Sequence, residues 1–264
     1  MPKFAANLTM MFNEVAFMER FDQAAAMGFS AVEFLFPYDY PVEQIQEALA
    51  RNQLQLVLHN LPAGNWAGGE RGIACHPDRV EEFRAGVDKA IAYASTLGVK
   101  QVNCLAGIKP PQVSEADARQ TLVDNLRYAT PRLAAAGIRL LIEPINTFDI
   151  PGFFLNRTQQ ALDIIADIGK DSGSDNVFVQ YDIYHMQRME GELAKTIEKN
   201  LSKIAHLQLA DNPGRNEPGT GEINYGFLFA FLDTIGYSGW IGCEYKPATT
   251  TQAGLGWAAH YLKQ

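Results

Sequence analysis

Short apolar runs rich in β-branched and aromatic residues recur along the chain, and each leads through a loop into a longer segment with helical periodicity. The runs that predict strands are residues 4–8, 31–36, 54–59, 100–105, 139–143, 177–182, 203–208 and 240–244. The clearest helical segments are residues 77–96, 114–136, 157–168 and 225–234. Several helical segments end at a glycine, as in AAAMGF and LAAAGI, which is typical of a helix C-terminus. Strand and helix therefore alternate along the chain.

Eight strands alternating with eight helices predict a (β/α)₈ TIM barrel, because roughly 33 residues per unit match the ~250 residues that this fold takes. No low-complexity or linker-like segment interrupts the pattern, so we expect residues 1–264 to form a single domain. A doubly wound open sheet is the rival arrangement. It usually has fewer units, and its dinucleotide fingerprint is missing, since GTGEIN at residues 219–224 lacks the third glycine.

On the face of each predicted strand that points into the barrel, the last residue is polar. Because residues two apart share a face of a strand, Val57 and His59 point into the barrel, while Leu56 and Leu58 point toward the helices. The same parity ends the other strands on Asn7, Glu33, Asn103, Glu143, Asp182, Gln208 and Glu244. A single polar strand end carries little weight, since the chain leaves the core there.

Three of these strand ends are carboxylates, Glu143, Asp182 and Glu244, and their strands would end at the same rim, where barrel enzymes carry their active sites. They would repel one another and raise each other's pKa unless a cation neutralised them. Together with Gln208 they form an all-oxygen ligand set, which suits Mg²⁺ or Mn²⁺ better than zinc. The pattern predicts a divalent metal site made of Glu143, Asp182, Gln208 and Glu244.

Two histidines and two cations lie near these positions in the sequence. His185 follows Asp182 by three residues, one helical turn, which would let it face the same site. His206 shares a strand face with Gln208 but sits two residues lower, so a hydrogen-bonded core histidine is the better interpretation. Arg215, in a loop rich in glycine and proline, is the first candidate to bind a substrate carboxylate, and Lys246 is the second.

The composition narrows the choice of partner and compartment. An apolar content of 47% excludes a disordered chain, and the lack of a long uncharged apolar run excludes a membrane span. The formal net charge of −8, without a basic stretch, argues against nucleic acid or an anionic membrane as partner. The N-terminus does not look like a signal peptide, and three widely spaced cysteines predict neither disulfides nor a zinc knuckle. A cytoplasmic protein is expected, and a homo-oligomer stays open.

Six segments carry a more specific pattern than the strand ends do. They are FAANLTMMFNEVAFMERFDQAAAMGFSAVEFLFPYDYP near the start, HNLPAGNWAGGERGIACHP after the third predicted strand, IEPIN around Glu143, QYDIYHMQRMEG around Asp182, HLQLADNPGRNEPGTGEINY after the seventh, and IGCEYKP around Glu244. On these segments the chain resembles the hydroxypyruvate isomerases. They are part of the wider xylose-isomerase-like TIM barrels, which include ketose epimerases and barrel-type apurinic endonucleases. The resemblance covers essentially the whole chain, although the fold alone does not fix the reaction.

The resemblance implies roles for the four proposed metal ligands. The glutamates matching Glu143 and Glu244 are the proton donor and acceptor in that family, and they share the metal site with the residues matching Asp182 and Gln208. Related ketose epimerases have a histidine where this chain has Gln208, and this departure bears on the identity and affinity of the metal. The resemblance further implies that five side chains bind substrate or lie in its pocket, namely His59, Glu70, Asn103, His185 and Arg215.

The implied reaction is an aldose-ketose type isomerisation of a small acid. Hydroxypyruvate and tartronate semialdehyde (2-hydroxy-3-oxopropanoate) would interconvert by metal-assisted proton transfer through an enediolate, as part of glyoxylate and carbohydrate metabolism. The nearest alternative is an isomerase of a longer acid such as a 2-oxo-tetronate, or a related sugar-acid isomerase or epimerase. More distant alternatives are a metal-dependent phosphodiesterase acting on abasic DNA and a non-catalytic protein that binds sugar acids.

Overall fold

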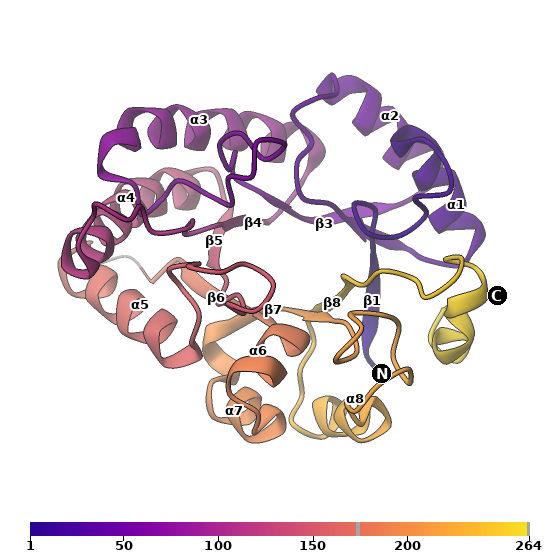
Figure 1. Cartoon of the computed structure of the whole chain (residues 1–264). Helices are drawn as coiled ribbons and strands as arrows, with labels where there is room; N and C mark the ends of the chain where they lie inside the picture. The colour runs from indigo at the N-terminus through magenta and orange to yellow at the C-terminus, as the bar shows by residue number, and fades with distance from the viewer. Residues whose placement is uncertain (173–174, 263–264) are drawn as a thin grey trace. The chain divides into compact units, whose positions relative to one another are not determined.

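The computed structural model describes residues 1–172 and 175–262, and within them eight strands lie in chain order in one closed parallel barrel (Figure 1). The strands are β1 (Lys3–Asn7), β2 (Ala31–Glu33), β3 (Gln55–Asn60), β4 (Gln101–Cys104), β5 (Arg139–Ile142), β6 (Val177–Asp182), β7 (Ile204–Leu209) and β8 (Trp240–Cys243). β1 pairs with β2 and with β8, which closes the strand order. The prediction of a (β/α)₈ TIM barrel is confirmed.

Helices follow the strands along the chain. The α-helices are α1 (Arg20–Ala26), α2 (Val42–Arg51), α3 (Val80–Leu97), α4 (Glu115–Ala135), α5 (Thr158–Ser172), α6 (Ile183–Met189), α7 (Leu193–Lys199) and α8 (Tyr225–Thr234). Short 3₁₀ helices are η1 (Phe17–Glu19), η2 (Pro77–Arg79), η3 (Leu201–Lys203) and η4 (Ala253–Ala258). Local chemistry sets their ends: the Ser114 side chain accepts the Asp117 amide at the start of α4, and Gly98, with φ of 71°, ends α3.

The helix expected over residues 157–168 extends to Ser172, and the helix expected over residues 77–96 begins as η2, with α3 starting at Val80. The other predicted boundaries hold to within one or two residues, except for the end of β2 at Glu33. That strand is shorter than expected because its register with β3 shifts between Val32 and Glu33. The sequence also predicts Glu143 and Glu244 as last strand residues, whereas β5 and β8 end one residue earlier. The Glu244 amide bonds the carbonyl of Gly242 instead of a neighbouring strand. The expected single helix per strand gives way to α6, α7 and η3 between β6 and β7, and to η4 after β8.

Contacts divide the chain into two compact units, residues 1–58 with 181–264, and residues 59–180. In the first unit, Phe4 of β1 packs edge-on against Phe229 of α8 and Trp257 of η4, with ring centroids 5.1 Å apart in both pairs. In the second unit, α4 contacts α3, α5 and β5. Whether residues 1–264 form the single domain expected from the sequence stays a prediction.

Two of the exclusions made from the sequence can be examined in the structure. No helix within residues 1–172 and 175–262 has the length and apolar character needed to cross a membrane. Cys75, Cys104 and Cys243 are all free, as their spacing predicts, and all three are buried. Burial raises the pKa of the Cys75 thiol to about 12, which favours the protonated thiol.

Candidate active site

A hydrogen-bonded network of buried polar side chains joins the ends of β1, β2, β7 and β8. Its members, each at most 6% exposed, are Asn7, Glu33, His206, Gln208 and Glu244, and we refer to them as the carboxylate network. The Asn7 amide donates to Glu33 Oε1 at 2.9 Å and to Glu244 Oε2 at 3.4 Å. Strand parity predicted that these side chains share the interior face, and the hydrogen bonds confirm that they meet.

Gln208 and His206 are the β7 members of the carboxylate network. Gln208 Nε2 donates to Glu33 Oε1 at 2.8 Å and to Glu244 Oε2 at 2.5 Å. His206 Nε2 lies 2.6 Å from Glu33 Oε2, and its ring is fully buried. The interpretation of His206 as a hydrogen-bonded core histidine is therefore confirmed. Glu33 was recognised as a strand end in the sequence, but its role as the acceptor at the centre of this network was not.

Asp182 combines two positions, the last residue of β6 and the N-cap of α6. Its Oδ1 accepts the backbone N–H groups of Tyr184 at 2.8 Å and of His185 at 3.2 Å, which fixes the start of the helix. One helical turn then brings His185 Nε2 to 3.6 Å from Asp182 Oδ2, as the three-residue spacing predicts. Both side chains are at most 2% exposed.

Burial and the nearby guanidinium of Arg215 shift the pKa values of Glu244, Asp182 and His185. Burial raises the pKa of Glu244 and of Asp182 above the usual carboxyl range, although the positive charge of Arg215 acts in the opposite direction. Burial lowers the pKa of His185 well below 6.5, and the charges of Arg215 and Arg188 lower it further. His185 is thus neutral beside Asp182, and the pair is not an ion pair.

We expect the metal-free wild-type protein to lose stability relative to a Glu244→Gln variant as the pH rises from about 5 to about 8. The raised pKa of Glu244 means that the folded state retains a proton which the unfolded chain, at its ordinary pKa of 4.5, has released. Folding therefore takes up a proton and becomes less favourable with rising pH. Melting temperatures of both proteins in chelator across this range measure the difference, and a difference that stays constant would contradict the expectation.

Arg215 joins the network from the loop between β7 and α8. Its Nη2 donates to Glu244 Oε1 at 2.9 Å and lies 3.5 Å from His185 Nε2, while its guanidinium carbon is 5.3 Å from the centre of the Tyr184 ring. The side chain is 19% exposed. The sequence indicated a loop arginine near the site, and the structure places it on Glu244. Tyr184 was not identified from the sequence, where an aromatic residue on a short helix looks like core.

The loop that carries Arg215, residues 211–223, is built around the buried carboxylate of Asp211, and we call it the Asp211 loop. The two carboxylate oxygens accept four backbone N–H groups at 2.9 to 3.0 Å, those of Asn212, Gly219, Gly221 and Ile223. A Cβ atom on Gly221 would lie 2.0 Å from a carbonyl oxygen, so this position needs glycine. Arg215 itself adopts the left-handed region with φ of 56°, held by its own amide bonded to the Asp211 carbonyl.

The unit of residues 59–180 holds the other candidate residues. Asn103 Nδ2 donates to Glu143 Oε2 at 2.9 Å, and both side chains are buried, at 0% and 4% exposed. Within the described residues, Oδ1 of Asn103 accepts no hydrogen bond. His59 is fully buried, and burial lowers its pKa to about 4, so its ring is neutral. Asn103 and Glu143 are thus in direct contact, a pairing that the sequence did not predict.

Glu70 lies in the long loop after β3, and its carboxylate is held within that part of the chain. It accepts the backbone N–H of Asn65 and pairs with the guanidinium of Arg79. Gly72 forms a bridge to Ala106, and a Cβ on Gly72 would lie 2.4 Å from the Leu105 carbonyl oxygen. These contacts anchor the loop. The role of Glu70 in a substrate pocket stays a prediction.

Among the described residues of the unit 1–58 and 181–264, cavities lie at two places relevant to the site. One, of about 510 Å³, follows the ends of β1 and β8 and is lined by Thr9, Met10, Asn13, Glu14, Lys246, Pro247, Thr249 and Thr251. Its wall is tied to the carboxylate network, since the amides of Thr9 and Met10 bond Asn7 Oδ1. The volume suits a small ligand.

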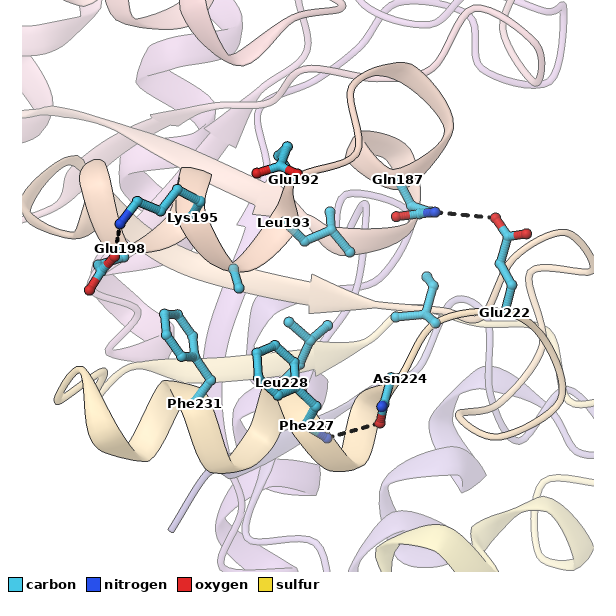
Figure 2. A pocket seen from close by; sticks show the side chains of 12 residues that line it. Gln187, Glu192, Leu193, Lys195, Glu198, Glu222, Asn224, Phe227, Leu228 and Phe231 are labelled. Carbon is cyan, nitrogen blue, oxygen red and sulfur yellow. Dashed lines mark hydrogen bonds and ion pairs between the residues drawn. The ribbon is translucent and has the colours of Figure 1, made fainter.

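The other cavity, of about 430 Å³, opens between α7 and α8 (Figure 2). Figure 2 shows Leu193 of α7 on one side and Phe227 and Phe231 of α8 on the other, with Gln187 donating to Glu222 at the rim. Its lining contains none of the side chains proposed from the sequence to act in catalysis, metal binding or substrate binding. We therefore assign the candidate site to the strand ends.

The donor atoms of the candidate residues fit a hard divalent cation. Asp182 Oδ2 is buried and accepts no hydrogen bond from residues 1–172 or 175–262, although a carboxylate oxygen out of water needs a partner. Asp182, Glu143 and His185 all carry atoms that can ligate a metal ion, and all three are buried. Carboxylate and amide oxygens dominate the predicted set, as Mg²⁺ and Mn²⁺ prefer.

Comparisons with known proteins show the family of the chain. Residues 21–261 match the family described as xylose isomerase-like TIM barrel. The hydroxypyruvate isomerase of Escherichia coli (strain K12) is 58% identical over 261 residues, which are 99% of this chain and 100% of that protein. The 2-oxo-tetronate isomerase of Cupriavidus necator is 47% identical over 262 residues, 99% of each chain.

Solved structures show the same fold. The crystal structure of an AP endonuclease, family 2, from Brucella melitensis has a TM-score of 0.96 and 44% identity, and each chain is covered to 100%. The 3-keto-D-glucoside 4-epimerase of E. coli has a TM-score of 0.79 at 21% identity, covering 97% of this chain and 98% of that one, which shows a shared fold alone.

Proposed function

Because the chain belongs to the xylose isomerase-like TIM barrel family, we propose that it is an isomerase that interconverts hydroxypyruvate and tartronate semialdehyde. The observation that carries the proposal is the buried carboxylate of Glu244, which lies under one guanidinium and has a raised pKa. A carboxylate of raised pKa can take a proton from carbon and return it near neutral pH. The names of relatives aligned over the whole chain support the same class of reaction.

In the proposed mechanism, one glutamate of the pair Glu143 and Glu244 removes a proton from C3 of hydroxypyruvate. The electron pair of the broken C–H bond forms the enediolate, the hydroxyl proton passes from the C3 oxygen to the C2 oxygen, and a proton is delivered to C2. Both glutamates directly follow strands of a closed parallel barrel, and active sites of this fold lie at the carboxyl ends of the strands.

We propose that Glu143, Asp182, Gln208 and Glu244 hold the cation, either Mg²⁺ or Mn²⁺. When bound, it would supply Lewis-acid stabilisation of the negative charge that develops on the substrate oxygens. The buried Asp182 oxygen without a hydrogen bond supports this assignment. His185, His59, Asn103 and Glu70 are proposed to line the substrate pocket.

We assign this activity to the cytoplasm, as part of glyoxylate and carbohydrate metabolism. Three free, buried thiols fit a reducing compartment. The substrate would be a small 2-oxo or hydroxy acid, and a net charge of −8 does not favour nucleic acid or an anionic membrane as partner.

Arg215 is proposed to bind the substrate carboxylate, and we expect Arg215→Ala to raise KM for acids by about 10-fold or more. The same change removes the charge that lowers the pKa of Glu244, so the pH at which kcat rises should shift upward. Initial rates across pH for an acid and for its neutral amide separate the two effects. Arg51→Ala, which breaks only an exposed ion pair with Asp22, serves as the control. An equal rise of KM for acid and amide would refute the assignment.

The decisive experiment follows proton exchange at carbon. The purified protein is incubated in D₂O with Mg²⁺ or Mn²⁺ and a panel of acids, including hydroxypyruvate and a 2-oxo-tetronate, and NMR detects deuterium next to the carbonyl. Exchange in hydroxypyruvate is expected at the highest rate. Exchange in none of the acids would refute the isomerase class.

The acid panel, together with a cleavage assay on abasic duplex DNA and a binding assay with the same acids, separates the alternatives. Faster turnover of the four-carbon acid would favour a 2-oxo-tetronate isomerase, the name of the Cupriavidus necator relative. Cleavage of abasic duplex DNA would favour a phosphodiesterase, in line with the name AP endonuclease of the Brucella melitensis structure. Binding of an acid without exchange or cleavage would indicate a sugar-acid binding protein.

A further inference from the structure

Glu33 is a buried carboxylate that the proposed reaction does not use. It ends β2, is 1% exposed, and accepts hydrogen bonds at Oε1 from Asn7 at 2.9 Å and from Gln208 at 2.8 Å. Its Oε2 lies 2.6 Å from His206 Nε2. Among the described residues it makes no ion pair with a lysine or arginine. Burial of a carboxylate costs desolvation free energy that hydrogen bonds must offset. A buried carboxylate at this position therefore points to a role for its hydrogen bonds.

The neighbouring strand is shaped to admit this carboxylate. A Cβ atom on Gly242 of β8 would lie 2.2 Å and 2.3 Å from the two Glu33 oxygens and 2.4 Å from the carboxyl carbon. A glycine inside a strand often marks such a close approach. Gly242, in the IGCEYKP segment, thus leaves the space that the Glu33 carboxylate occupies.

Gln208 receives its orientation from two acceptors. A planar side-chain amide has two N–H donors on one nitrogen, and here they go to Glu33 at 2.8 Å and to Glu244 at 2.5 Å. With the nitrogen turned toward both carboxylates, the amide oxygen is directed to the opposite side. We propose that Glu33 is a positioning residue that presents the Gln208 oxygen to the cation and ties Gln208 to Glu244.

This inference rests on the proposed function, and it gives a physical reason for an amide at position 208. An imidazole carries at most one N–H on each ring nitrogen, so no single atom of a histidine could donate to both Glu33 and Glu244. The two acceptors therefore favour an amide over an imidazole at this position. An oxygen ligand follows from that choice, and it favours Mg²⁺ or Mn²⁺ over softer metals.

The first test observes the Gln208 amide directly, in metal-free protein. In ¹⁵N-labelled protein, the Gln208 side-chain signal is assigned by its loss in Gln208→Ala, and exposed Gln252 is the internal reference. Both Gln208 protons are expected to exchange with solvent at least about 100-fold more slowly than those of Gln252. In Glu33→Leu, one of the two should lose this protection. Free exchange in wild type, or unchanged protection in Glu33→Leu, would overturn the proposal.

The second test is a double-mutant cycle read out by Mn²⁺ alone, using the electron paramagnetic resonance signal of the unbound ion. Glu33→Leu is expected to raise the Kd for Mn²⁺ by about 10- to 100-fold. In the Gln208→Ala background, the same substitution should change the Kd less than about threefold, because its effect passes through Gln208. Equal losses in both backgrounds would show that Glu33 acts by charge or by general packing, and would overturn the proposal.

If Glu33→Leu does not fold, Gly242→Ala replaces it in the cycle. This change leaves Glu33 chemically intact and displaces its carboxylate, and the same 10- to 100-fold loss is expected. Gly256→Ala is the matched control, because a Cβ there meets nothing within 4 Å. A Gly242→Ala protein with the wild-type Kd would overturn the proposal.

The outcomes distinguish this inference from the function on which it rests. A wild-type protein that binds Mn²⁺ and exchanges deuterium, with both properties unaffected by the Glu33 and Gly242 variants, refutes the positioning role and leaves the isomerase standing. A wild-type protein that binds no Mn²⁺ refutes the proposed cation site and the positioning role together.

Discussion

Glutamine in place of Glu143 or of Glu244 is expected to lower kcat at least about 100-fold and up to about 10⁴-fold, the range in which general acid-base groups act. Glutamine keeps the size of the side chain but cannot take a proton from carbon. In Glu244→Gln, the amide also replaces the carboxyl group that Arg215 contacts at 2.9 Å. Single-turnover deuterium exchange into hydroxypyruvate measures the chemical step directly.

The control for both variants is Glu198→Gln. Glu198 is an exposed residue of α7 that pairs with Lys195, and exposed pairs contribute little to stability. Its turnover should equal that of wild type. Melting temperatures confirm that each variant is folded. A Glu143 or Glu244 variant that retained more than about a tenth of the wild-type kcat would not have lost an acid-base group, and that glutamate would leave the mechanism.

Removal of divalent cations is expected to abolish turnover, with a loss of more than about 100-fold that either Mg²⁺ or Mn²⁺ restores. The same ions should raise the melting temperature, because they bind the folded protein and relieve the repulsion between buried Asp182 and Glu244. At 100 times the Kd, the gain is ~2.7 kcal/mol, which corresponds to about 5 to 10 °C for a chain of this size.

Calorimetry of the chelated protein with and without added metal measures this gain. In Asp182→Asn, the gain in melting temperature should fall, because the uncharged amide attracts a cation less strongly. A chelated protein that kept its rate within twofold would remove the metal from the mechanism. Restoration by Zn²⁺ but not by Mg²⁺ or Mn²⁺ would contradict the oxygen ligand set.

The sequence predicted those parts of the site that depend on local spacing. Strand parity placed Asn7, Glu33 and Gln208 on one interior face, and the one-turn spacing brought His185 beside Asp182. Both periodicities are properties of the backbone, so they can be recognised without the tertiary structure. The barrel itself follows from the same regular alternation of strand and helix.

The remaining features arise from contacts between residues distant in the sequence. Nothing in the loop sequence indicates that Arg215 would meet Glu244, 29 residues away. The role of Asp211 was also missed, because its partners are backbone N–H groups, which every non-proline residue carries. Likewise, the orientation of the Gln208 amide depends on acceptors from β2 and from the end of β8, and only the folded chain brings these together.

The Asp211 loop bears on how a three-carbon acid can be bound at all. Small ligands gain at most about 1.5 kcal/mol per non-hydrogen atom, whereas fixing one residue of a flexible loop costs about 1–2 kcal/mol. If substrate binding had to order residues 211–223, the entropic cost would exceed the binding free energy that so few atoms can provide. Four backbone N–H groups bonded to the Asp211 carboxylate order the loop during folding, so its conformational entropy is lost before substrate binds. Arg215 is therefore already positioned in the ligand-free protein.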